Sequence, residues 1–374
     1  MANLFSEFTL KDVRLKNRIG VSPMCQYSAI DGMPNAWHQV HLGSLAAGGA
    51  GLVVAEATAV SPEGRITPGD TGLWNGEQAE AFRPIVRFIE QQGAVPGIQI
   101  AHAGRKASAN KPWEGDDHIA AGHPDAWEPI APSALAYGAH LPRTPREMTV
   151  ADIARVREAF AASAVRALDA GFKWLELHLA HGYLGQSFFS PLANRRTDEY
   201  GGSFRNRARF LLETLAAVRA VWPENLPLTA RLGVIDYVDG EQSLEESIEL
   251  IRLMKAEGLD LIDVSMGFNT PDVSRVPWAE HAFLAPIAQR IRDEVRIPAA
   301  TSWNISDAKK TDELIRKEQV DLVFLGKALL SDPHWPYHAA QILGVQMPQG
   351  VLPDQYAFWL KRQPKPGEPD TLRA

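Results

Sequence analysis

A chain of 374 residues, 45% hydrophobic and 22% charged, has the composition of a globular protein, which excludes the disordered and collagen-like classes. The net charge of −7 and the lack of a basic run argue against nucleic acid as a partner. The length fits one large α/β barrel or two medium domains.

The single cysteine, Cys25, leaves no internal disulfide and excludes a Cys-ligated iron–sulfur cluster or a Cys-rich zinc site. No apolar run approaches the roughly 20 residues that span a bilayer, so we expect no membrane partner. The first residues, MANLFSEFTLKD, have neither the basic region nor the apolar core of an export signal. A cytoplasmic protein is therefore expected.

Short apolar runs recur along the chain, and each is followed by a longer amphipathic stretch. In chain order they are IGVSPM from Ile19, GLVVAEAT from Gly51, VPGIQIAH from Val95, FKWLELHLA from Phe172, LPLTARLGV from Leu226, LDLIDVSM from Leu259, IPAATS from Ile297 and VDLVFLGK from Val320. Eight such units predict a (β/α)8 TIM barrel. The alternative, a doubly wound open sheet, usually has a Gly-rich fingerprint after its first strand, where SPMCQYSA stands here.

The chain is predicted to form a single domain spanning 1–374, with two segments added to the barrel. FTLKDVRLKN, with a turn-like Lys11-Asp12, predicts an N-terminal hairpin that closes the bottom of the barrel. The long Pro-rich connection after strand 3, residues 103–148, is typical of a lid or binding loop, and a packed surface excursion is the alternative.

Alternation along the predicted strands separates polar from apolar side chains. The residues on the polar faces are Gln99, Glu176, His178, Thr229, Arg231, Asp263 and Ser265. The apolar faces must pack on the helices, so the polar side chains point into the barrel near the carboxyl ends of the strands. Barrel enzymes place their chemistry there, whereas a purely structural barrel would fill this layer with branched aliphatics. The pattern therefore indicates an active site.

His178, His181 and Tyr183 follow the fourth strand in HLAHGY. Two imidazoles above the barrel can donate N–H groups to a carbonyl oxygen that gains negative charge, and a tyrosine can donate a proton. Two alternatives stay open at this point. In one, the histidines bind a metal with carboxylates such as Glu176 or Asp263; in the other, they form a satisfied core pair.

Arg231 is a guanidinium predicted to point into the barrel, where it needs an anionic partner. A ligand that becomes anionic is one partner, and an internal ion pair with Asp263 or Glu176 is the other. Gln99 offers both a donor and an acceptor, which suits the edge of a heterocycle.

The loops after strands 7 and 8 often form a phosphate site in such barrels. Here they contain Ser302-Trp303-Asn304 and Gly326-Lys327-Ala328, whose backbone N–H groups and lysine charge suit a phosphate. Cys25, at the end of the first strand, is either inert packing or part of the same site.

Four motifs, SPMCQYSA, HLGSLAAGGAGLVVAEATAV, HAGRKA and HGYLGQSFFSPLANRRTDEYGGSFRNR, resemble the Old Yellow Enzyme family of FMN-dependent ene-reductases, and most closely the branch of bacterial xenobiotic reductase. The resemblance covers nearly the whole chain. It implies a barrel that binds FMN noncovalently over the strand ends and takes hydride from NADPH or NADH. No metal is implied.

The resemblance also implies roles for individual residues. Arg231 is expected to face the N1–C2 carbonyl edge of the flavin, and Cys25 to lie near N5 and tune its potential. His178 and His181 are expected to hydrogen-bond the substrate's carbonyl oxygen, and Tyr183 to be the proton donor. The residues expected to line the flavin are Ser22, Pro23, Met24, Cys25, Ala57 and Gln99, with Ser302, Trp303, Gly326 and Lys327 near its phosphate.

The chain departs from the family pattern at the phosphate loops. Ser302 stands where glycine is common, followed by Trp303, which matches the xenobiotic-reductase branch. Lys327 replaces the usual arginine, and because lysine lacks the bidentate fork, weaker phosphate binding is expected.

Tyr27 and Trp303 are expected to line the substrate pocket. Trp359 resembles a tryptophan that reaches a neighbouring subunit's pocket, which implies a homodimer or homotetramer with the tail 345–374 at the interface. A packed tail aromatic is the alternative for Trp359.

The predicted function is ping-pong reduction of the activated C=C bond of α,β-unsaturated carbonyl compounds, with nitro compounds or nitrate esters as the alternative substrates. An aldolase on the same barrel would need an inward lysine, and Lys173 begins its strand at the wrong end. A noncatalytic flavin-binding barrel stays open. The dienoyl-CoA reductase branch needs a four-cysteine cluster, which one cysteine excludes.

Overall fold

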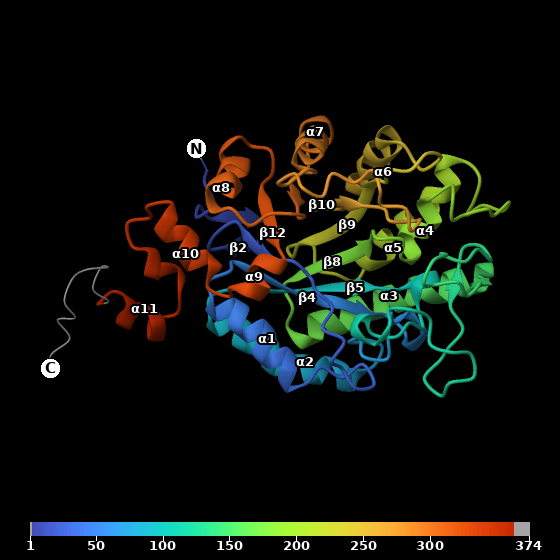
Figure 1. Cartoon of the computed structure of the whole chain (residues 1–374), viewed down its shortest axis with the longest axis horizontal. Coiled ribbons are helices and arrows are strands. Elements are labelled where there is room, and N and C mark those ends of the chain that lie inside the picture. The colour runs from blue at the N-terminus through green and yellow to red at the C-terminus, as the bar shows by residue number, and fades with distance from the viewer. Residues whose placement is uncertain (1, 363–374) are drawn as a thin grey trace.

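The computed structural model describes residues 2–362. Within them, parallel strands close into a barrel with helices around its outside, and neighbouring strands follow the order of the chain (Figure 1). The barrel strands are β3 (Ile19–Val21), β4 (Leu52–Ala59), β5 (Val95–Ala101), β8 (Trp174–Leu179), β9 (Leu228–Ile235), β10 (Leu261–Met266), β11 (Ala299–Thr301) and β12 (Leu322–Leu325). Because β12 pairs with β3, the sheet closes on itself and has no edge strand. The predicted (β/α)8 barrel is therefore confirmed, and the alternative of a doubly wound open sheet is wrong.

The helices pack an apolar face on the barrel. They are α1 (Ala36–Ala47), α2 (Gly76–Gln91), α3 (Val150–Ala170), α4 (Leu184–Phe189), α5 (Phe204–Arg219), α6 (Leu244–Ala256), α7 (Ala285–Val295), α8 (Ala308–Arg316), α9 (Lys327–Ser331), α10 (Trp335–Ile342) and α11 (Asp354–Leu360). Their starts follow local chemistry: for example, Thr149 and Ser243 accept N–H bonds from Asp152 and Glu246 in capping boxes at α3 and α6. No helix in residues 2–362 is both long and apolar enough to cross a membrane.

The amino-terminal hairpin closes the floor of the barrel, as predicted. β1 (Phe8–Leu10) and β2 (Val13–Leu15) pair antiparallel across the Lys11-Asp12 turn, where Lys11 has φ 52°. Their buried side chains share one apolar cluster with the first residues of four barrel strands, namely Leu52, Trp174, Leu261 and Leu322. The amino ends of the strands are therefore sealed by apolar packing.

The connection 103–148 contains short elements only: η2 (Gly104–Lys106), η3 (Pro112–Glu114) and a parallel pair of β6 (Ile130–Ala131) with β7 (Arg146–Glu147). Trp127 anchors it to the turn after β4, since its indole N–H donates to the carbonyl of Glu63 at 3.0 Å. Trp113 is 65% exposed. The segment is thus anchored at Trp127, whereas Trp113 is exposed to solvent. Its role as a lid stays a prediction.

Candidate active site

The inward polar layer predicted from strand alternation is present. Register places Gln99 beside Glu176, and Arg231 between His178 and Asp263. All five side chains are buried. Neighbours in register on parallel strands point to the same side of a sheet, so these polar groups meet inside the barrel. Gln99 Nε2 donates to Glu176 Oε1 at 2.7 Å.

Arg231 combines the two roles that were open for it. Its Nε donates to Asp263 Oδ2 at 2.5 Å and lies 3.7 Å from Glu176 Oε1, so the internal ion pair exists. Its Nη2 donates to Ser22 Oγ at 3.2 Å, and the residue also lines the large cavity at the carboxyl ends of the strands. Burial raises the pKa of Glu176 to about 7, against the opposing effect of the Arg231 charge. The guanidinium is therefore fixed from below by carboxylates and presented to the cavity above.

That cavity has a volume of about 590 Å³, within the range of small-molecule and cofactor sites. Its wall contains two cationic residues, of which Arg231 is buried and Lys327 is exposed. The candidate residues that line it are Ser22, Pro23, Met24, His181, Arg231, Ser302, Trp303, Gly326 and Lys327, and Phe324 and Trp278 add apolar wall.

The other candidates lie outside that lining. Ala57 and Tyr183 border a separate gap that is too narrow to hold a water molecule. Burial raises the pKa of the Cys25 thiol, while hydrogen bonds to the Ala57 backbone and the Tyr27 side chain act in the opposite direction. Cys25, Tyr27, Ala57 and Tyr183 therefore form a second group, and Gln99 lies deeper, bonded to Glu176.

Trp359 is not brought to this chain's own cavity. It belongs to α11 and is 61% exposed, in a groove formed with residues of α10 and the turn before it such as His334 and Tyr337. Figure 1 shows α11 at the outer side of α10, away from the centre of the barrel. Its contact with a neighbouring subunit stays a prediction, and the rest of the predicted interface segment, 363–374, lies outside the described residues.

His178, His181 and Tyr183 are brought together. The ring centroids of His178 and His181 are 4.9 Å apart, and those of His178 and Tyr183 are 5.0 Å apart. The pKa of each imidazole is well below its ordinary value, mainly because the ring is buried. Nearby positive charges, including those of Arg231 and Lys106, lower both pKa values further. Burial raises the pKa of Tyr183 well above its usual range. At neutral pH the site thus contains two uncharged imidazoles and a protonated phenol.

The metal alternative receives no support from the arrangement of the side chains. Within residues 2–362, no three His, Cys, Asp or Glu side chains gather as a metal site. His178 and His181 are also not a fully satisfied core pair, because the one hydrogen bond of the His178 ring within residues 2–362 is that accepted from the backbone N–H of Ala180, at 3.3 Å.

Lys106 carries no predicted role, yet the structure places it in the site. Its Nζ donates to the carbonyls of His181 at 2.7 Å and Phe268 at 3.1 Å, and lies 5.7 Å from the Tyr183 ring. Burial lowers its pKa to about 7. The only signal in the sequence is its position in HAGRKA, directly after β5, at the mouth of the barrel.

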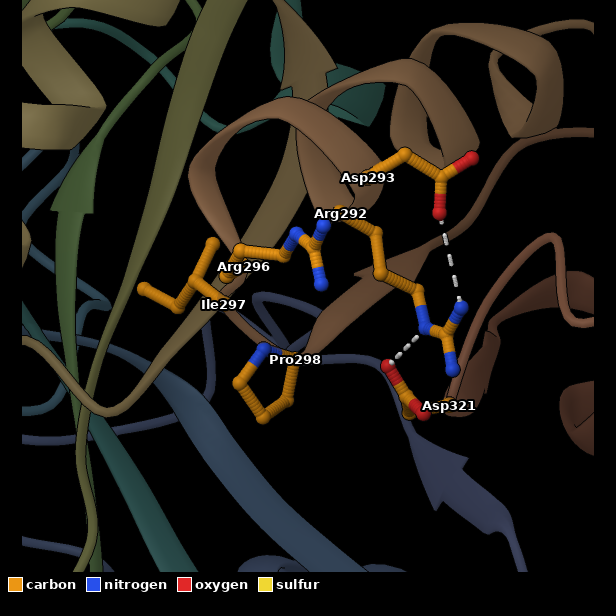
Figure 2. A pocket seen from close by; sticks show the side chains of 6 residues that line it. All are labelled: Arg292, Asp293, Arg296, Ile297, Pro298 and Asp321. Atoms are coloured by element: carbon orange, nitrogen blue, oxygen red, sulfur yellow. Dashed lines mark hydrogen bonds and ion pairs between the residues drawn. The ribbon is translucent and has the colours of Figure 1, made fainter.

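A second cavity of about 520 Å³ lies at the floor end, before β11 and β12 (Figure 2). Its wall contains two arginines and two aspartates, and Figure 2 shows Arg292 bonded to Asp321, at 2.9 Å, and near Asp293, at 3.7 Å. These charges offset one another, and the cavity lies at the wrong end of the strands for barrel chemistry.

Comparison with known proteins agrees with this geometry. The model of the NADH:flavin oxidoreductase / NADH oxidase family matches residues 3–345. An NADPH dehydrogenase of Geobacillus sp. (strain WCH70) is 42% identical over 350 residues, which are 93% of this chain and 96% of that protein.

Two solved structures are similar as well. Morphinone reductase in complex with tetrahydroNAD has a TM-score of 0.75 at 26% identity, over 92% of this chain and 91% of that one. A 2-naphthoyl-CoA reductase has a TM-score of 0.82 at 24% identity; the match covers 94% of this chain but 53% of that one, and it shows the fold alone.

The fold, the cavity and the relatives together define a flavin oxidoreductase built on a (β/α)8 barrel. The chain belongs to the NADH:flavin oxidoreductase / NADH oxidase family, and its resemblance to the Old Yellow Enzyme family is confirmed. It is an FMN-dependent enzyme with NAD(P)H as its reductant.

Proposed function

We propose that this enzyme reduces the activated C=C bond of α,β-unsaturated carbonyl compounds. The observation that carries the proposal is the group of two uncharged imidazoles and one protonated phenol, His178, His181 and Tyr183, at the mouth of the barrel. The imidazoles are suited to a carbonyl oxygen, and the phenol is suited to a carbon that must be protonated.

The residues of the large cavity fit FMN. Pro23, Met24 and Phe324 supply apolar wall for a planar ring, and Arg231 supplies a buried cation. The residues that would hold the phosphate are Ser302, Gly326 and Lys327, which line the same cavity, and of these the Lys327 side chain is exposed. When bound, FMN supplies hydride transfer between the nicotinamide and the substrate.

His178 and His181 act on the substrate oxygen in this proposal. Negative charge develops on that oxygen as the β-carbon is reduced, and N–H donors already in place stabilise it without reorganisation. Each donor contributes about 3 kcal/mol to the transition state by analogy with other oxyanion sites. Because the two donors act as one unit, the loss of both is expected to be smaller than the sum.

Tyr183 gives its proton to the α-carbon. Its raised pKa keeps the phenol protonated at neutral pH, which is the state that a proton donor needs. Lys106 lies 5.7 Å from its ring, so a positive charge on that amine favours the phenolate left after transfer.

The remaining candidates keep supporting roles. We place Cys25, Ala57 and Gln99 against the flavin, Tyr27 and Trp303 in the substrate pocket, and Trp359 in the pocket of a second subunit. The Tyr27 side chain acts on the pKa of the Cys25 thiol, which supports a shared position for these two. Nitro compounds and nitrate esters present acceptor oxygens to the same histidines and are the alternative substrates.

The test is Tyr183→Phe in the flavin-loaded enzyme, with the two half-reactions followed separately by anaerobic stopped-flow absorbance. We expect flavin reduction by NADPH to change less than threefold and flavin reoxidation by 2-cyclohexenone to slow by roughly 100-fold, since only the second step needs the proton. Tyr200→Phe, which removes a hydroxyl that donates to Glu213 at 2.9 Å outside the cavity, is the matched control and should change neither. Equal losses in both half-reactions would remove Tyr183 from this role.

A further inference from the structure

We infer that Ser265 is a positioning residue that holds His181 in its Nδ1–H tautomer, with the indole N–H of Trp303 setting the direction of the Ser265 hydroxyl. The chemical state of His181 follows from the geometry alone. Its importance for turnover rests on the proposed function, in which His181 must donate to the substrate oxygen.

The three side chains form a short chain of hydrogen bonds inside the mouth of the barrel. Ser265 lies on β10 and is 0% exposed. Its Oγ is 2.7 Å from His181 Nε2 and 3.0 Å from Trp303 Nε1. The described part of the chain offers this hydroxyl no third partner.

The protons of this chain can be counted. An indole N–H only donates, so Ser265 Oγ accepts from Trp303. The one proton of the hydroxyl is then directed to His181 Nε2, which must accept it and must therefore be unprotonated. A neutral imidazole with a bare Nε2 has its proton on Nδ1.

The opposite arrangement leaves a buried group unpaired. If His181 donated from Nε2, Ser265 Oγ would accept two hydrogen bonds and its own proton would have no acceptor among the described residues. Buried hydroxyl groups rarely remain unpaired, because they lose their bonds to water without replacement. The Nδ1–H form of His181 is the one that satisfies all three side chains.

His178 has the other tautomer. Its Nδ1 accepts from the backbone N–H of Ala180 at 3.3 Å, so its proton is on Nε2. His178 Nε2–H and His181 Nδ1–H are then both donors without a hydrogen-bond partner among residues 2–362. In the other tautomer His181 would present a lone pair at Nδ1, which repels a carbonyl oxygen. Ser265 thus decides whether the pair offers two donors or one.

Trp303 is held firmly enough to act as the reference of this chain. It has φ 74°, an unfavourable backbone conformation for a bulky residue, so the surroundings must hold it there. Its ring centroid lies 5.5 Å from that of Phe268, 5.7 Å from that of Trp278 and 5.8 Å from that of His181. The loop after β11 therefore brings its N–H to Ser265 at a fixed position.

The direct test is ¹⁵N NMR of the flavin-loaded enzyme labelled at histidine, because protonated and bare ring nitrogens differ in chemical shift. At pH 8 we expect a bare Nε2 and a protonated Nδ1 for His181, assigned by their loss in His181→Asn. In Ser265→Ala the signals should move toward the Nε2–H form, and in Trp303→Phe, which keeps the Ser265 hydroxyl, toward a mixture. Ser163→Ala removes a buried hydroxyl on α3 and should change nothing.

A kinetic test follows the same variants. Ser265→Ala should slow flavin reoxidation by 2-cyclohexenone by roughly 100-fold, the lower end of the range for a lost oxyanion donor. Ser265→Thr, which keeps the hydroxyl, should restore the rate and the His181 tautomer to within about threefold of the wild-type values. The half-reaction with NADPH serves as a measure of intact flavin binding.

Two outcomes overturn the inference: an Nε2–H form of His181 in the wild-type enzyme, or a tautomer that Ser265→Ala leaves unchanged. The failure of the proposed function is a separate result. An enzyme that reduces no enone would still report the tautomer by NMR, whereas a normal effect of Tyr183→Phe with an unaffected tautomer would reject only the role of Ser265.

Discussion

The two ends of this barrel bury different kinds of side chain: apolar ones at the floor and polar ones at the mouth. At the floor, the β1–β2 hairpin covers the first residues of the strands with an apolar cluster that includes Leu15 and Trp174, both 0% exposed. At the mouth, the inward layer is polar and incompletely paired: Glu176 Oε2 and Asp263 Oδ1 are buried and have no hydrogen-bond partner among the described residues. The floor contributes stability, and the mouth retains polar groups that a ligand can use.

The largest loss of stability should come from a substitution that removes the buried ion pair at the mouth of the barrel. Arg231→Leu leaves Asp263 and Glu176 buried without their cation, and we expect the free energy of unfolding to fall by about 3–5 kcal/mol in urea denaturation. The flavin midpoint potential should also become more negative, because a positive charge near the reduced ring is lost.

The matched control for that variant is Arg252→Leu, an exposed arginine on α6 that pairs with Glu249 and Glu294. Exposed ion pairs stabilise little, so a change below about 1 kcal/mol is expected. If Arg231→Leu lowered the free energy of unfolding as little as this control does, the stability of the protein would not depend on the buried ion pair. Separately, an unchanged flavin midpoint potential would contradict the proposed position of Arg231 beside the flavin.

An intermediate effect should come from the floor. Leu15→Ala removes a fully buried side chain from the hairpin cluster and should lower the free energy of unfolding by about 3 kcal/mol, by lost burial and a residual cavity. The rate of enone reduction per flavin-bound protein should stay within about twofold, measured by NADPH oxidation at 25 °C. A large drop in that rate would show that floor and mouth are coupled.

The smallest expected change in the free energy of unfolding is its dependence on pH through the titration of Lys106. Burial lowers the pKa of its amine to about 7 in the folded enzyme, below the ordinary value of 10.5 for lysine. Between these two pH values the unfolded chain binds the extra proton, so the contribution of Lys106 to stability rises with pH by about 1.4 kcal/mol per unit.

Urea denaturation at pH 6.5, 7.5 and 8.5 checks this point by comparison with Lys106→Met, which lacks the titrating group. The gain in stability with pH should be larger for the wild type, by about 2 kcal/mol across that range. Parallel pH dependence in both proteins would show that the amine keeps its ordinary pKa.

Much of the fold was open to prediction because its signals are local. Eight apolar runs mark the strands, and alternation along IQIAH and TARLG places Gln99 and Arg231 on the inner face. The hairpin at Lys11-Asp12 follows from its turn. The gathering of His178, His181 and Tyr183 also follows from their closeness in the chain, since one strand end and one short loop contain all three.

The partners of these residues were harder to predict. Whether Arg231 would bind Asp263 or a ligand was open, and its guanidinium does the first with Nε and remains available for the second. Ser265 was expected on the inner face, but its bond to His181 joins positions 84 residues apart. Lys106 reaches the carbonyl of His181 across 75 residues.

The sequence by itself determined the barrel, the inward face of each strand and the family. The tertiary structure alone decided which inward groups pair, which nitrogen of each imidazole remains available, and that Lys106 enters the site. The reason is that side-chain alternation has a period of two residues and can be read along one strand, whereas pairing across the barrel depends on strand register and on the paths of loops that begin far apart in the chain.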